Sequence, residues 1–125
     1  MGIPTKRVQI KLGDGTKKRF LRFDFEAISR LEEEIGEPLE LTLRRAATLS
    51  ARSITGLVWA GLLHEEPEIT IKKVRSLIPL DDIKGILEIV TNAVMRGTGQ
   101  KDEEEEEEGD KGLGKKETAE EGQEG

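Results

Sequence analysis

The chain has 125 residues, a net charge of −6 and no cysteine. This length suits one domain, and the lack of cysteine excludes disulfides, thiol catalysis and thiolate metal sites. No apolar run approaches the roughly 20 residues that a membrane span needs, and no apolar segment of the kind found in secretion signals follows the first residues. The sequence therefore predicts a cytoplasmic protein without a membrane partner.

The negative charge is concentrated near the C-terminus. Residues 101–125 contain 4 Lys and 12 Asp or Glu, a net charge of −8, whereas residues 1–100 contain 16 Lys or Arg and 14 Asp or Glu, a net charge of +2. From residue 98 onward the apolar side chains are Leu113 and Ala119. Such a segment cannot bury enough surface to offset the entropy of ordering it. The sequence thus predicts a folded domain over residues 1–97 and a disordered acidic tail over residues 98–125.

The beginning of the domain has the period of β-strands. Val8, Ile10 and Leu12 alternate with polar residues, and residues 17–23 alternate again. Between these two runs, residues 13–15 read Gly-Asp-Gly, and glycines supply the positive φ that a hairpin turn needs. We expect a β-hairpin with one face packed on helices, because two strands alone are only marginally stable in water.

A helix is expected immediately after the hairpin, over residues 25–35. Asp24 can cap its start, and Gly36 can stop it. Its expected buried stripe recurs every three or four residues and comprises Phe25, Ile28, Leu31 and Ile35. A second, short helix between residues 39 and 49 is expected to be capped by Thr42.

The remaining helices also have start and stop signals. They are expected from the cap Ser50 through Leu63, from the cap Thr70 to Pro79, and from Asp81 and Asp82 to Arg96 and Gly97. Gly56 and Gly61 inside the first of these are explained by close packing against another element. The predicted fold class is α+β and mostly α: an N-terminal β-hairpin packed on four to five short helices, followed by the disordered acidic tail.

Residues that could carry catalysis do not assemble into a known arrangement. His64 is the only histidine, and with Glu65 and Glu66 beside it there is no zinc-ligand spacing. Residues 32–34 are three consecutive glutamates, which point in different directions on a helix and fit a solvated face better than an acid–base pair. The acidic run at residues 102–108 lacks the spacing of a calcium-binding loop. We therefore predict no enzyme activity, no cofactor and no metal site.

Two groups of residues are candidates for binding a partner. Trp59 lies about 100° from the expected buried stripe of its helix. It is either a core residue or, together with Leu62 and Leu63, part of an apolar partner-binding surface, since Trp is favoured at interfaces. The densest basic cluster consists of Arg44, Arg45 and Arg52. The nearly neutral domain, the acidic tail and the few aromatic residues disfavour nucleic-acid binding by this cluster.

Two segments carry a family resemblance. Residues 21–36 run from a strand into a helix that starts Asp-Phe-Glu-Ala, and residues 57–74 contain Trp-Ala-Gly-Leu followed by Glu-Glu-Pro. In order and spacing they resemble the small tail assembly chaperones of long-tailed bacteriophages and gene transfer agents. The resemblance covers roughly residues 18–95. Glu66 departs from it, because Asp is commoner before this Pro.

The resemblance implies a phage or prophage protein of the host cytoplasm. Such chaperones bind the tape measure protein, recruit tail tube subunits to it and are absent from the finished tail, and many have a second form extended by a ribosomal frameshift. Coating a long client needs many copies, so self-association is an alternative to a monomer. Two other functions stay open: a structural head–tail or tail protein of the virion, and a small nucleic-acid-binding regulator.

Overall fold

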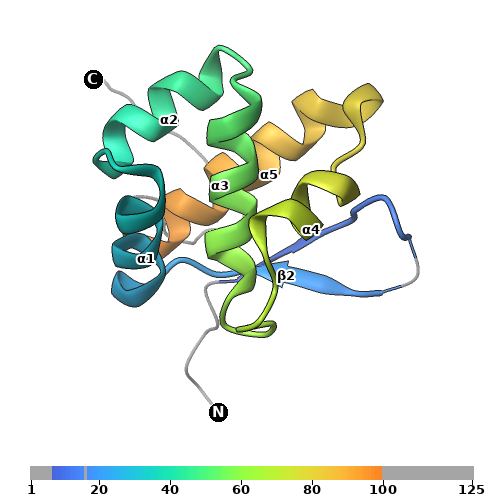
Figure 1. Cartoon of the computed structure of the whole chain (residues 1–125), viewed down its shortest axis with the longest axis horizontal. Helices are drawn as coiled ribbons and strands as arrows, with labels where there is room; N and C mark the ends of the chain where they lie inside the picture. The colour runs from blue at the N-terminus through green and yellow to red at the C-terminus, as the bar shows by residue number, and fades with distance from the viewer. Residues whose placement is uncertain (1–6, 16, 100–125) are drawn as a thin grey trace, which may run out of the picture.

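The computed structural model describes residues 7–15 and 17–99 (Figure 1). A two-stranded hairpin precedes five α-helices, which confirms the predicted fold class. In chain order the elements are β1 (Val8–Ile10), β2 (Arg19–Leu21), α1 (Phe25–Ile35), α2 (Leu39–Ala47), α3 (Ala51–Leu62), α4 (Ile71–Leu77), the 3-10 helix η1 (Leu80–Asp82) and α5 (Ile83–Gly97). The predicted acidic tail lies outside the described residues, apart from Thr98 and Gly99.

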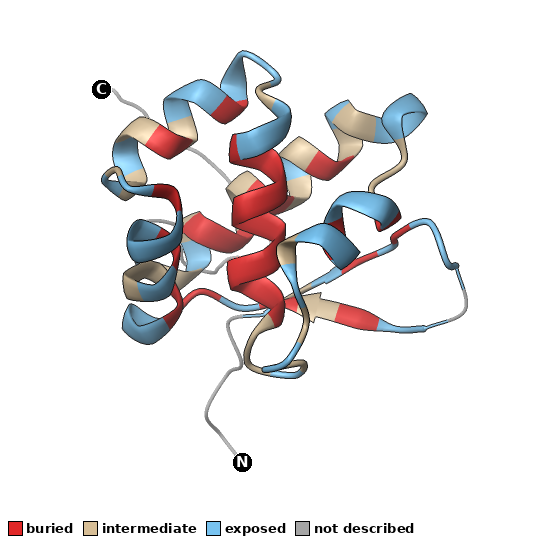
Figure 2. Ribbon diagram, viewed as in Figure 1, coloured by how far each residue is buried: buried red, intermediate tan, exposed pale blue. Residues whose placement is uncertain are grey.

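Helix α3 is the centre of the domain. It contacts α1, α2, α4, α5 and β2, and residues 53–62 are all buried, as the red central helix in Figure 2 shows. Two glycines allow neighbours to approach this closely. A Cβ atom at Gly56 would lie 2.8 Å from Ile35 Cδ1, and one at Gly61 would lie 2.9 Å from Leu21 Cδ2. The expected close packing at both glycines is confirmed.

The hairpin packs one face against α3 and α5. Its strands are antiparallel, with Val8 opposite Leu21 and Ile10 opposite Arg19, and Gly15 has the positive φ of 65° expected of the turn. The second strand is shorter than the predicted 17–23. Beyond Leu21 the chain leaves β1, because the amide of Arg22 donates to the Gly61 carbonyl at 2.9 Å near the end of α3.

Helix α1 begins and ends where expected. Asp24 Oδ1 accepts a hydrogen bond from the Ala27 amide at 2.9 Å, and Gly36 ends the helix in the left-handed conformation at φ 83°. The predicted stripe is wrong at Phe25, which is 84% exposed. Two steps of three residues turn a helix back by about 120° in total, so Phe25 lies away from the face on which Leu31 is buried. Ala27 occupies that face instead.

The predicted cap of α2 is also wrong. The residue before the helix is Pro38, and Thr42 is buried one turn inside. The Leu39 amide at the start of α2 donates to Glu32 Oε2 at 2.9 Å, so a carboxylate of α1 satisfies an amide that has no partner within the helix. Helix α2 therefore begins at Leu39, four residues before the start that a cap at Thr42 would give.

The later helices start at the predicted caps. Ser50 accepts from the Ser53 amide at 3.2 Å, and Thr70 accepts from the Lys73 amide at 3.0 Å. Asp81 and Asp82 lie in η1, which leads directly into α5. Within the part of the chain that is described, no helix combines the length and apolar character needed to span a bilayer.

Candidate functional site: a cleft between three helices

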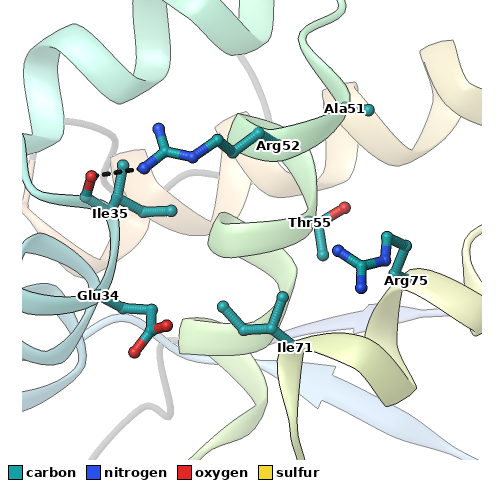
Figure 3. Close-up of a pocket in the computed structure, with 7 residues that line it drawn as sticks. All are labelled: Glu34, Ile35, Ala51, Arg52, Thr55, Ile71 and Arg75. Carbon is teal, nitrogen blue, oxygen red and sulfur yellow. Dashed lines mark hydrogen bonds between the residues drawn. The ribbon is translucent and has the colours of Figure 1, made fainter.

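A cleft of about 480 Å³ lies where α1, α3 and α4 meet (Figure 3). This volume falls in the range of roughly 300–1,000 Å³ that is typical of binding pockets. The C-terminal end of α1, the first turns of α3 and the exposed side of α4 contribute its lining residues: Glu34, Ile35, Ala51, Arg52, Thr55, Ile71 and Arg75.

Helical periodicity brings these side chains together. Ala51 and Thr55 are four residues apart on α3, and Ile71 and Arg75 are four residues apart on α4. Residues with this spacing lie on one face of a helix, one above the other. Trp59 follows Thr55 by another four residues, so it lies one turn further along the same face of α3. The caps Ser50 and Thr70 fix where the two helices, and hence these faces, begin.

The cleft has an apolar floor and a charged rim. Ile35 is buried, Thr55 is only 5% exposed and Ile71 is half-buried. Glu34 and Arg75 are exposed and stand on opposite sides, Glu34 on α1 and Arg75 on α4, with Ile71 between them (Figure 3). An apolar strip between opposite charges is the complement of an amphipathic segment.

The charged and polar groups of the cleft differ in how they are bonded. Arg52 Nη2 donates to the Ile35 carbonyl at 2.7 Å, which satisfies an oxygen at the C-terminal end of α1. Glu34 and Arg75 form no ion pair or hydrogen bond with another residue in 7–15 or 17–99. Within the same ranges no side-chain hydrogen bond involves Thr55 Oγ1 either. These three groups are therefore free to bind a ligand from outside the described part of the chain.

The residues predicted to bind a partner lie mainly in the core. Leu62 is fully buried, and Leu63 is half-buried against the core. Trp59 is 7% exposed, and its indole Nε1 donates to the Ile69 carbonyl at 3.0 Å. The Arg30 guanidinium lies 5.8 Å from the centre of the Trp59 ring. In this conformation Trp59 and Leu62 do not form an exposed surface, and Trp59 instead supports the α3 face that leads into the cleft.

The predicted basic cluster is divided among separate contacts. Arg44 pairs with Glu40 at 2.8 Å, Arg45 pairs with Glu37 at 3.2 Å, and Arg52 is bonded to the Ile35 carbonyl. Acidic neighbours on and beside α2 thus offset much of the positive charge that a phosphate backbone would require.

A charge cluster around the buried Arg19 was not predicted. Arg19 is only 3% exposed; its Nε donates to Glu66 Oε2 at 3.0 Å, and its Nη1 lies 3.0 Å from Asp14 Oδ2, out of line for a hydrogen bond. The cluster joins β2 to the hairpin turn and to the loop between α3 and α4. Its signal in the sequence is that Arg19 alternates in phase with the buried Leu21 and Phe23. Its role is structural.

His64 also has a structural contact. Its Nε2 lies 2.9 Å from the Phe20 carbonyl, which ties the end of α3 to the hairpin. No group of three or more His, Cys, Asp or Glu side chains in the described residues is arranged to hold a metal ion.

Comparison with known protein families, with characterised proteins and with solved structures finds no match to this chain. The two segments on which the expected family rests, residues 21–36 and 57–74, pack against each other. Gly61 abuts Leu21, and Arg30 covers Trp59. The same segments contribute Glu34, Ile35 and Ile71 to the cleft.

Proposed function

We propose that this protein is a tail assembly chaperone that binds the tape measure protein and recruits tail tube subunits to it during tail assembly. The observation that carries the proposal is the cleft between α1, α3 and α4, with its apolar floor and charged rim. Grooves of this kind receive amphipathic helices through apolar anchors spaced by three or four residues. By the resemblance, the client is a long protein with hydrophobic helical stretches.

The position of the resembling segments supports the proposal. They lie far apart in the sequence, but their side chains interlock around Gly61 and Trp59 and supply part of the cleft lining. Because residues 21–36 and 57–74 contribute to one cleft, their combined resemblance supports the proposal better than two short motifs in unconnected parts of the fold would.

The chemistry of the cleft favours binding over catalysis. Its hydroxyl, Thr55 Oγ1, has no hydrogen bond to a side chain that could act as its base among the residues described. The charged groups that line it are one carboxylate and two guanidinium groups, and Arg cannot serve as a general base at ordinary pH. We therefore include in the proposal that the protein is not an enzyme. By the resemblance, it acts in the host cytoplasm.

Co-expression with a fragment of the tape measure protein tests the proposal. A soluble complex is expected with the wild-type chain. Ala51→Trp should reduce complex formation, because a large side chain at this exposed lining position fills the cleft. Ala47→Trp is the matched control, since Ala47 is also exposed but lies at the end of α2, outside the lining.

Two results would count against the proposal. The first is a tape measure fragment that aggregates equally with and without the protein. The second is the presence of the chain in purified mature virions by mass spectrometry, which would favour a structural tail or head–tail protein.

A further inference from the structure

The opposite charges of the cleft give it a polarity. Glu34 stands on the α1 side and Arg75 on the α4 side (Figure 3). We propose that the cleft seats an amphipathic helix of the partner in one orientation, with a carboxylate on Arg75 and Thr55, a cationic side chain against Glu34 and apolar side chains on Ile71. This inference rests on the proposed function and specifies the chemistry of the segment that the chaperone binds.

Arg75 and Thr55 form the acid-binding side. The lining contains two arginines, and Arg52 is engaged by its hydrogen bond to the Ile35 carbonyl. Arg75 has no such partner among residues 7–15 and 17–99. Thr55 is more than nine-tenths buried, lines the same cleft and has an unpaired hydroxyl in the described structure. A guanidinium beside a hydroxyl donor provides the two kinds of hydrogen bond that a carboxylate accepts.

Glu34 forms the opposite side and argues against a phosphate backbone as the ligand. Its carboxylate is free of ion pairs within the described chain, so a cationic side chain of a partner can pair with it. A nucleic acid presents only negative charge to this rim, and the apolar side chains of Ile35 and Ile71 offer no stacking platform for bases. The mixed charge and apolar floor fit a protein helix better.

Peptide binding to the full chain tests the proposal. Overlapping synthetic peptides of about 25 residues, long enough for several helical turns, would cover the tape measure protein encoded by the same genome. Trp59 is the only tryptophan and lies one turn from Thr55, so its fluorescence can report binding of peptides without Trp. For the tightest peptide, Arg75→Glu should weaken binding about 10- to 100-fold, which is the range expected for losing a charge-assisted hydrogen bond.

Matched controls separate position from net charge. Lys72→Glu is the control for Arg75→Glu, because it also replaces a cation by a carboxylate on α4 but lies outside the cleft lining. A second pair tests the other side of the cleft: Glu34→Lys changes the lining, and Glu33→Lys is its control outside the lining. Both controls should leave the affinity within about 3-fold, as expected for screened surface charges. Thr55→Val should weaken binding without loss of the fold, and reversing the peptide's acidic residue to Lys should restore binding to Arg75→Glu.

The outcomes distinguish this inference from the function on which it rests. If a peptide binds the wild type and Arg75→Glu equally well, the chaperone proposal stands and the charge assignment fails. If no peptide binds, both fail. A third outcome is that the wild type retards a labelled DNA duplex in gel electrophoresis in a salt-dependent manner and that Arg75→Glu abolishes this effect. Arg75 would then bind phosphate, and the peptide assignment would be overturned.

Discussion

Gly97 shows how a single residue can set the distance between a helix, α5, and the connection between β2 and α1. A Cβ atom at this position would overlap the Phe23 carbonyl oxygen, which is backbone and cannot move aside cheaply. We expect Gly97→Ala to lower the free energy of unfolding by about 1–3 kcal/mol, the range for overpacking a well-packed site. Equilibrium denaturation by urea measures this change.

The matched control is Gly85→Ala in the same helix. There the nearest atom to a new Cβ would be Asp82 Oδ1, the end of an exposed side chain that can rotate away. Ala is the better helix former, so stability should stay constant or rise by up to about 1 kcal/mol. Equal losses in the two variants would contradict the assignment of Gly97 to close packing.

The buried Arg19 makes a second prediction at this scale. Arg19→Met keeps most of the side-chain volume but leaves Glu66 and Asp14 without the cation between them. We expect a loss of about 2–4 kcal/mol, below the largest values for buried pairs because both carboxylates keep some contact with water. Lys18→Met, at the exposed neighbour, should change stability by less than ~0.5 kcal/mol in the same thermal or urea titration.

Periodicity predicted most inward-facing residues but failed at Arg19 and Phe25. The alternation of Ile10, Leu12, Leu21 and Phe23 was sufficient to assign the buried face of the hairpin. Arg19 shares that phase, yet a charge is expected outside unless its partners are known, and Asp14 and Glu66 come from other parts of the fold. Phe25 is apolar and three residues before Ile28, so it fits the expected stripe of α1, but the packing against α3 buries the face with Ala27 instead.

At the scale of elements, the carboxylate of Glu32 is the contact that starts α2. Glu32→Ala removes the acceptor of the Leu39 amide. We expect a loss of about 0.5–2 kcal/mol, as for other helix-capping side chains. Glu33→Ala, one residue along the same exposed surface, should be nearly neutral. If hydrogen exchange of the first turn of α2 is as slow in Glu32→Ala as in Glu33→Ala, the cap is not important for this helix.

Helix starts were predictable where the cap is local. Asp24, Ser50 and Thr70 each accept from the amide three residues further on, a pattern that is visible in the sequence. The start of α2 was not predictable in this way, because its capping carboxylate belongs to the preceding helix. Thr42 had the right side chain for a cap, but the tertiary structure placed it inside the helix.

At the scale of the whole molecule, the division into a domain and an acidic tail stays a prediction. Removing residues 100–125 should change the free energy of unfolding by less than ~0.5 kcal/mol, because their composition predicts that they bury little apolar surface. Solubility should fall, since the net charge would change from −6 for the chain to about +2 for what remains. A large drop in the unfolding midpoint would instead mean that residues 100–125 stabilise the folded domain.

The cleft could not be predicted from the sequence. Its residues come from three helices, and their approach depends on the packing of α3 against α1 and α4. The sequence pointed to α3 through Trp59 but not to the free charges of Glu34 and Arg75, which look like ordinary surface residues until their neighbours are known. Resemblance and periodicity therefore located the helix, and only the structure located the site.

Hydrogen exchange of the full chain with and without a bound tape measure fragment tests the central claim most directly. The first turn of α3 and the short helix α4 should exchange readily in the free protein, because helix ends and short helices open locally. Binding in the cleft predicts slower exchange at residues 33–36, 51–55 and 71–75. Slower exchange confined to the hairpin or to the region around the exposed Phe25 would contradict the assignment of the cleft as the partner site.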